Sequence, residues 1–142
     1  MFNSITGKAI IDSGSPHILL PEEAYKAFAA ALVDAAPQFN CTNEDGTLAE
    51  YCYQSWTNCT PISASMPELS FTLSDGPKFT LPGSGYSYST VAGTDDAYLG
   101  ADSKCSLAVR SWTGSDVILG AAFMRNFVFT FDYTNLEMGM AV

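Results

Sequence analysis

The chain has 142 residues, of which 47% are hydrophobic and 15% are charged, so it suits one globular domain with a real core. Its 6 Lys and Arg residues stand against 15 Asp and Glu residues, giving a formal net charge of −9. This balance repels nucleic acid and anionic membrane surfaces, so we expect neither as a partner. No apolar stretch is long enough to span a bilayer, and residues 1–8 lack the pattern of a signal peptide.

The first part of the chain predicts two short strands and a helix. Residues 9–11 and 18–20 are apolar runs that indicate buried strands on either side of Asp12-Ser13-Gly14. Pro21 stands where the first turn of a helix accepts proline, and Pro37 ends the helix. Apolar residues at three- and four-residue steps predict the face that packs on the sheet: Ala24, Phe28, Ala31, Leu32 and Ala35.

The rest of the chain predicts mostly short strands. Residues 38–65 are polar and hold three of the cysteines, which indicates irregular structure with short strands. Apolar and polar residues alternate in 69–73 and 79–81 around a turn, which predicts a β-hairpin. The remaining predictions are a strand at 86–91, a buried strand at 117–120, a helical turn at 121–126 and a hairpin over 127–142. The pattern indicates a mostly β barrel or sandwich with one main helix and short helical turns.

Cysteines and glycosylation motifs point to an oxidising compartment. Four cysteines are present and no pair has the C-x-x-C spacing of zinc or redox sites, so we expect no metal or cofactor. Two N-x-T sequons predict glycosylation at Asn40 and Asn58, each followed directly by a cysteine. Together these features favour a secreted or a vacuolar or lysosomal protein. Four cysteines permit three disulfide pairings, among which the sequence alone does not choose.

Asp12 is the candidate for catalysis, because it is a carboxylate at the end of an apolar strand. Gly14 provides the backbone freedom that a tight turn needs, and Ser13 and Ser15 can donate hydrogen bonds that orient the carboxylate. General acid–base chemistry on a water molecule requires a carboxylate fixed in this way. Taken alone, Asp-Ser-Gly-Ser is also an ordinary Asx-type turn.

Several motifs in the same order resemble the C-terminal lobe of pepsin-like aspartic proteases. Residues 9–15, Ala-Ile-Ile-Asp-Ser-Gly-Ser, are similar to the hydrophobic-hydrophobic-Asp-Thr/Ser-Gly-Thr/Ser signature of that family. Residues 117–127 are similar to its second signature, an Ile-Leu-Gly strand beneath the catalytic loop that leads into a short helix. Further segments resemble its mid-lobe strands and closing hairpin: 66–71, 79–81, Tyr86, 131–132 and 138–141. The resemblance implies that residues 1–142 form one lobe of the pepsin-like acid protease β-barrel fold, with the N-terminal lobe absent.

The resemblance implies a role for each residue around the loop. Asp12 would be one of two catalytic aspartates, and Ser13 would brace the two catalytic loops through its hydroxyl. Gly14 and Ser15 would contact the substrate backbone, and Ser15 would also bond the outer oxygen of Asp12. Two isoleucines would line or support the substrate pockets beside the catalytic centre, namely Ile10 and Ile118.

The resemblance also implies a disulfide pattern and reveals two departures. Cys59–Cys105 would be the usual bridge of the lobe, which leaves Cys41–Cys52 as a local loop closure. Pro16 and His17 stand where the family usually has small hydroxyl residues, which weakens the expected anchoring of substrate beyond the scissile bond. A nucleophilic Ser–His pair with His17 is not expected, since no nucleophile-elbow pattern surrounds it.

Peptide hydrolysis in this class needs two carboxylates that share one proton, so that one activates water while the other supplies a proton. Only one Asp-Ser/Thr-Gly motif occurs here. We therefore expect an aspartic endopeptidase lobe that acts on polypeptides, is inactive alone and needs a second lobe for the other aspartate.

Three alternatives remain open. A homodimer would pair two copies of Asp12, although the helix and the cysteine-rich insert argue against it. A non-catalytic, inhibitor-like binding module on the same fold would explain Pro16 and His17. A plain structural β domain would explain the composition but not the ordered motifs.

Overall fold

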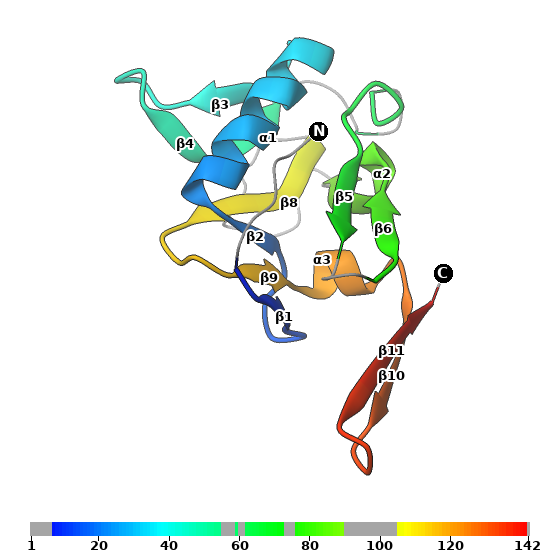
Figure 1. The fold of residues 1–142 in the computed structure, drawn as a ribbon. Helices are drawn as coiled ribbons and strands as arrows, with labels where there is room; N and C mark the ends of the chain where they lie inside the picture. The colour runs from blue at the N-terminus through cyan, green and yellow to red at the C-terminus, as the bar shows by residue number, and fades with distance from the viewer. Residues whose placement is uncertain (1–6, 55–58, 60–61, 73–75, 90–104, 142) are drawn as a thin grey trace.

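The structure, a computed structural model, describes residues 7–54, 59, 62–72, 76–89 and 105–141 (Figure 1). Its first half contains β1 (Ala9–Ile11), β2 (Ile18–Pro21), α1 (Glu22–Ala35), β3 (Asn40–Thr42), β4 (Leu48–Gln54), β5 (Leu69–Thr72) and β6 (Lys78–Leu81). Its second half contains α2 (Gly83–Tyr86), β7 (Ser87–Ser89), β8 (Cys105–Trp112), β9 (Val117–Leu119), α3 (Ala121–Met124), β10 (Val128–Asp132) and β11 (Glu137–Ala141). No helix in these ranges is long and apolar enough to cross a membrane.

A mixed sheet forms the body of the molecule. Its strand order is β1-β9-β2-β8-β4-β3, and β7 also pairs with β8. β1 runs parallel to β9 and β2 runs parallel to β8, while the other neighbours are antiparallel. The mostly β fold class of a pepsin-like lobe is therefore confirmed. The sheet ends at β1 and β3, so within the described residues it is open and the expected barrel does not close.

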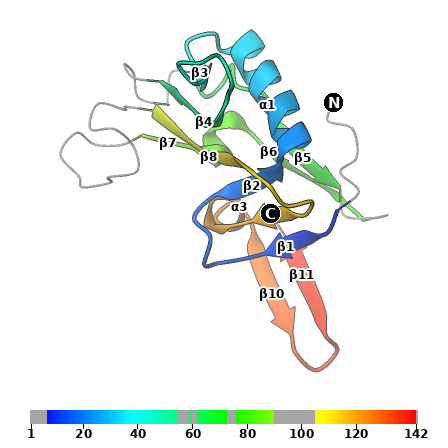
Figure 2. The same ribbon diagram turned by 90° about the vertical axis from the view of Figure 1, so that its left-hand side faces the viewer.

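The helix α1 covers one face of the sheet (Figures 1 and 2), where it contacts β8, β2 and β3. It ends before Pro37, as predicted, but it begins directly after Pro21, which is the last residue of β2 and not part of the first helical turn as expected. The buried face is rotated from the predicted one, since it consists of Tyr25, Phe28, Ala29 and Leu32, while Ala35 is exposed. The aromatic rings explain the rotation, because they bury far more apolar area than alanine methyl groups. Phe28 packs edge-on against Tyr86, with ring centroids 5.6 Å apart.

The predicted hairpin forms from β5 and β6, with Leu69 opposite Leu81 and Phe71 opposite Phe79. It packs on α3 through the edge-to-face contact of Phe71 with Phe123, and Phe79 makes a similar contact with Phe127 just after α3. The strand predicted over 86–91 begins later than expected, because α2 occupies Gly83–Tyr86 and β7 covers Ser87–Ser89. A Cβ atom at Gly83 would lie 2.3 Å from the Ser63 carbonyl oxygen, so this helical turn needs glycine. Residues 90–91 lie outside the described residues.

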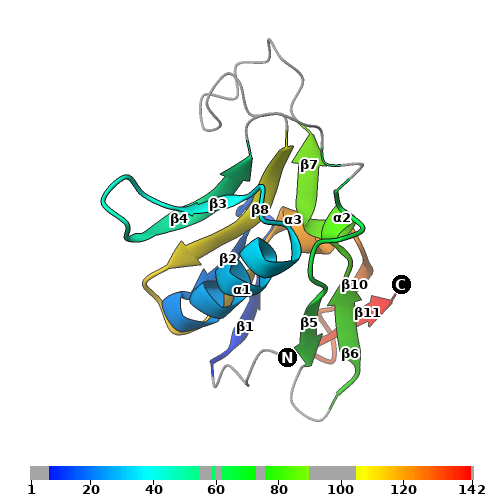
Figure 3. The ribbon, with the colours of Figure 1, turned by 90° about the horizontal axis from the view of Figure 1, so that it is seen from above.

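Two disulfides fasten the sheet, and they join the pairs that the resemblance implies. Cys41 is bonded to Cys52 between β3 and β4, and Cys59 is bonded to Cys105 at the start of β8. β8 lies against β2, β4 and β7 (Figure 3), and its residues 105–110 are all buried. Disulfides of this kind fit an extracellular or secretory-pathway protein.

The hairpin of β10 and β11 projects away from the sheet, as Figures 1 and 2 show. Phe129 lies opposite Met140 and Phe131 lies opposite Met138, so the predicted closing hairpin forms. Its base reaches the core, because Phe129 packs against Phe123. Other large apolar side chains of the hairpin are exposed, namely Val128, Phe131, Tyr133, Leu136 and Met138.

Candidate active site

The pairing of β1 with β9 positions Asp12. In this parallel pair Ile10 lies opposite Ile118 and Ile11 lies opposite Leu119. The N–H group of Asp12 extends the ladder by donating to the Leu119 carbonyl, with an N···O distance of 3.2 Å. Asp12 is thus the first residue beyond a strand that is fixed to the Ile-Leu-Gly segment near the other end of the chain.

The turn after Asp12 holds the carboxylate in one orientation. The Gly14 N–H donates to Oδ1 of Asp12 at 2.9 Å, and the Ser15 N–H donates to the Asp12 carbonyl at 3.2 Å. Asp12 is half-buried, whereas Ser13 and Gly14 are exposed. A bond from the Ser15 hydroxyl to the outer oxygen of Asp12 is not found among the described residues. A backbone N–H thus orients the carboxyl group.

α3 begins directly beneath this turn and fixes it from below. The N–H groups of Ala121 and Ala122 donate to the carbonyls of Ser15 and Pro16, at 2.7 and 3.2 Å. A Cβ atom at Gly120 would lie 2.2 Å from the His17 carbonyl oxygen and 2.3 Å from that of Ser15. Only glycine allows an approach this close, which explains why a glycine follows Ile118 and Leu119 in the second signature.

Ile10 and Ile118, the predicted pocket residues, lie side by side at the rim of this loop. Ile10 is 43% exposed and Ile118 is half-buried. An apolar pair beside a polar loop is a suitable surface for a substrate side chain. Their contact with substrate stays a prediction, as do the interlobe bond of Ser13 and the substrate contacts of Gly14 and Ser15.

Arg110 was not identified from the sequence, although it lies near the loop. It is a buried residue of β8, with its guanidinium carbon 4.9 Å from the centre of the Tyr51 ring and one nitrogen 4.0 Å from Glu50. Burial and, second, the charge of Arg110 lower the pKa of His17 to about 4. His17 is therefore neutral at physiological pH. The available signal was a single cation that directly follows the apolar run of residues 107–109.

Other predicted sites lie away from this loop. Asn40 is exposed on β3, and Asn58 lies outside the described residues. Within the described ranges, no three His, Cys, Asp or Glu side chains are grouped as metal ligands would be.

Comparison with known families gives a match that covers the loop and the strands described above. The family model described as "Xylanase inhibitor C-terminal" matches residues 1–141. The match therefore includes the Asp12 turn, the β9 strand beside it and the projecting hairpin.

Proposed function

The chain belongs to the xylanase inhibitor C-terminal family, whose fold is that of the pepsin-like aspartic proteases, and we propose that it is one lobe of a two-lobed protein. In this proposal residues 1–142 are the C-terminal lobe, and Asp12 is one of two catalytic aspartates. The observation that carries this proposal is the oriented carboxylate at the end of β1. Its Oδ1 accepts a bond from Gly14, and its backbone is bonded to Leu119 of the neighbouring strand.

The proposed reaction is hydrolysis of a peptide bond by water. A second lobe would bring another carboxylate close to Asp12, and because two like charges so close cannot both ionise cheaply, the pair shares one proton. The ionised carboxylate takes a proton from water as the water oxygen attacks the peptide carbonyl, and the protonated one donates to the carbonyl oxygen. Collapse of the tetrahedral intermediate then breaks the C–N bond, and a proton passes to the leaving amine.

The test is cleavage of acid-denatured casein by the chain alone and by the chain fused to a pepsin-like N-terminal lobe. We expect cleavage only by the fusion, and we expect pepstatin to block it. Asp12→Asn should remove this activity, whereas Asp34→Asn, at an exposed position of α1, should leave it unchanged. Cleavage by the fusion that survives Asp12→Asn would refute the proposal. Pepstatin-sensitive cleavage by the chain alone, eluting as a dimer, would support the homodimer instead.

The description of the matching family favours a second candidate, an inhibitor-like lobe that binds a protein without catalysis. Pro16 supports it, because this exposed residue has no N–H or hydroxyl to hold a substrate backbone. The experiment is a xylan hydrolysis assay with a xylanase, with and without the chain. Inhibition that Asp12→Asn leaves intact, together with absent peptidase activity in the fusion, would favour the inhibitor.

We also propose a secreted or vacuolar location for this lobe, supported by the two disulfides and the sequons. Cell fractionation of the native protein tests it.

A further inference from the structure

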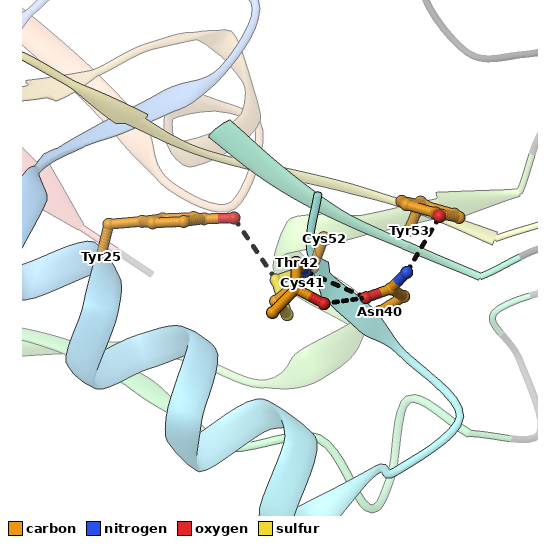
Figure 4. Close-up of a disulfide and its surroundings, with 6 residues drawn as sticks. All are labelled: Tyr25, Asn40, Cys41, Thr42, Cys52 and Tyr53. Atoms are coloured by element: carbon orange, nitrogen blue, oxygen red, sulfur yellow. Dashed lines mark hydrogen bonds between the residues drawn. A yellow bond between two sulfur atoms is a disulfide. The ribbon is translucent and has the colours of Figure 1, made fainter. Parts of the chain in front are cut away.

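The first sequon lies on the surface, directly beside the Cys41–Cys52 disulfide (Figure 4). Along β3 the side chains of Asn40 and Thr42 are exposed, while Cys41 between them is buried. This alternation is the ordinary consequence of strand geometry. It places the glycosylation motif on the outer face and its cysteine in the core.

The amide of Asn40 is bonded at both ends. Its Oδ1 accepts hydrogen bonds from the N–H and from the hydroxyl of Thr42, both at 2.9 Å. Its Nδ2 donates to the hydroxyl oxygen of Tyr53 at 3.0 Å, across the strand pair (Figure 4). Two donors on Oδ1 stabilise the negative charge that develops there when Nδ2 loses a proton, which makes Nδ2 a better nucleophile than a free amide nitrogen. The bonds from Thr42 therefore favour attachment of a sugar to Nδ2, although in the folded chain Nδ2 is itself bonded to the Tyr53 hydroxyl.

We propose that Asn40 carries an N-linked oligosaccharide and that closure of the Cys41–Cys52 disulfide ends the period in which it can be attached. The donor is an oligosaccharide on a polyprenyl diphosphate. The Nδ2–C1 bond forms as the bond from C1 to the diphosphate oxygen breaks. The Nδ2 proton passes to a base of the transferase, the polyprenyl diphosphate leaves, and no group is oxidised or reduced.

The arrangement of the two strands couples the disulfide to the sequon. Asn40 precedes Cys41 and Tyr53 follows Cys52, and Asn40 lies opposite Tyr53 in the β3–β4 pair. Forming the disulfide therefore brings the Tyr53 hydroxyl onto Nδ2 and fixes the sequon within a strand. The cysteines are separated by 11 residues, so closing their loop costs less entropy than closing the loop of the other disulfide, whose cysteines are separated by 46 residues. Closure thus competes directly with transfer of the sugar.

A glycan here would also protect the sheet. β3 is the last strand in the sheet order, so one of its edges has no partner strand in the described structure. Exposed strand edges pair with other chains unless something bulky or charged blocks them. A sugar chain on Asn40 would provide such a block.

In the experiment, the chain is expressed in yeast behind a cleavable secretion signal. The secreted chain is treated with a glycosidase that converts glycosylated Asn to Asp, and mass spectrometry then gives the glycosylated fraction of each sequon. We expect partial occupancy of Asn40 in the wild-type chain and loss with Thr42→Ala. Cys52→Ser, which leaves the sequon intact, should raise the occupied fraction. The matched control is the sequon of identical sequence at Asn58, whose cysteine pairs with Cys105; its occupancy should not change in Cys52→Ser.

Several results would overturn the proposal. An Asn40 that is unoccupied in both chains refutes attachment, and complete occupancy in the wild-type chain refutes the competition. An equal rise at Asn40 and Asn58 in Cys52→Ser would show a general delay in folding instead of local coupling. Tyr53→Phe keeps the disulfide and removes the hydroxyl that accepts from Nδ2, so it should raise the occupied fraction less than Cys52→Ser does. An equal or larger rise would show that the Tyr53 bond, and not closure of the disulfide, limits attachment.

Discussion

The sheet body and the β10–β11 hairpin are connected through α3, but they are held in opposite ways. Around the Asp12 loop, backbone groups approach so closely that a Cβ atom at Gly120 would lie 2.2 Å from a carbonyl oxygen. In the hairpin, a Cβ atom at Gly139 would lie 3.7 Å from the Cβ of Thr130, an ordinary contact. The loop is thus fixed by the chain's own backbone, whereas the hairpin depends on its own pairing and on contacts at its base.

The two regions also differ in how far their apolar side chains are buried. The large apolar side chains of the hairpin, such as Val128 at 64% exposed and Leu136 at 88% exposed, contribute little to the buried core. Stability should therefore depend strongly on the sheet body and weakly on the hairpin.

The largest expected effect is removal of a disulfide from the sheet body. Cys59→Ala/Cys105→Ala opens a separation of 46 residues, and Cys41→Ala/Cys52→Ala opens one of 11. On the chain-entropy account these changes lower the free energy of unfolding by about 4 and about 3 kcal/mol respectively. Urea titration of both double variants measures the difference. A loss below about 1 kcal/mol for either would show that the sheet body does not depend on its cross-links.

Gly120→Ala should destabilise the protein by about 3 kcal/mol, because the added methyl group forces apart the backbone of the loop and of α3. Gly139→Ala is the matched control in the hairpin, and its effect should stay within about 0.5 kcal/mol. Urea unfolding of both variants gives the comparison. Equal losses would contradict the distinction between the two regions.

Acid should lower the stability of the two regions in separate pH ranges. In the sheet body, the range is determined by protonation of His17. Its pKa in the folded chain is about 4, below the ordinary 6.5, because of burial and the charge of Arg110. The unfolded chain binds the proton more readily, so this contribution to stability is complete above pH 6.5 and is lost as pH falls towards 4. Since His17 is only partly buried, screening limits the loss to about 1 kcal/mol.

The hairpin turn should respond only at lower pH. Hydrogen bonds from the side chain and the N–H of Asn135 and from the N–H of Thr134 lower the pKa of Asp132 below 3.8, so its contribution persists until the pH falls below that value. Urea midpoints across this pH range should show a slope above pH 4 that His17→Gln reduces and Asp132→Asn does not. A slope that both variants share would refute the assignment.

The smallest expected effect lies at the tip of the hairpin. Leu136 has a φ of 55° and is 88% exposed, so its side chain gains little from packing while its backbone is strained. Leu136→Gly should relieve the strain and raise the free energy of unfolding by about 0.5 kcal/mol, after the entropy cost of glycine. Thermal melting measures this gain, and a lower melting temperature would show that Leu136 makes a stabilising contact.

The sequence predicts those elements of the fold whose side chains follow a clear period. The β5–β6 and β10–β11 hairpins alternate visibly, and Pro21 and Pro37 bracket α1. β8 gives no such signal, because residues 105–110 are buried on both faces and the apolar run 107–109 is short, with the polar residues Ser106 and Arg110 on either side of it. α2 was missed as well, since its Gly-Ser-Gly-Tyr sequence has little helix propensity and is held by Arg125 and Asn126, which donate to the Gly85 carbonyl.

The candidate site also has features that the sequence predicts and features that it does not. Asp12 and the Ile118–Gly120 segment were identified by their motifs, and the structure places them together. The bond from Gly14 to the carboxylate and the steric need for Gly120 involve backbone atoms, which leave no mark in residue type alone. The influence of Arg110 on His17 also requires three-dimensional proximity, since 93 positions separate the two in the sequence (110 − 17).

The backbone bond between Asp12 and Leu119 has a consequence for biosynthesis. During translation the Asp12 turn leaves the ribosome long before the strand that supports it, because Lys8 and its partner Asp116 at the start of that pairing are 108 positions apart. Until β9 emerges, the local bonds from Gly14 and Ser15 to Asp12 can form, but no neighbouring strand holds the turn in place. Premature termination between the Asp12 turn and Val117 would therefore yield a polypeptide that contains the Asp-Ser-Gly sequence but lacks the strand that positions it.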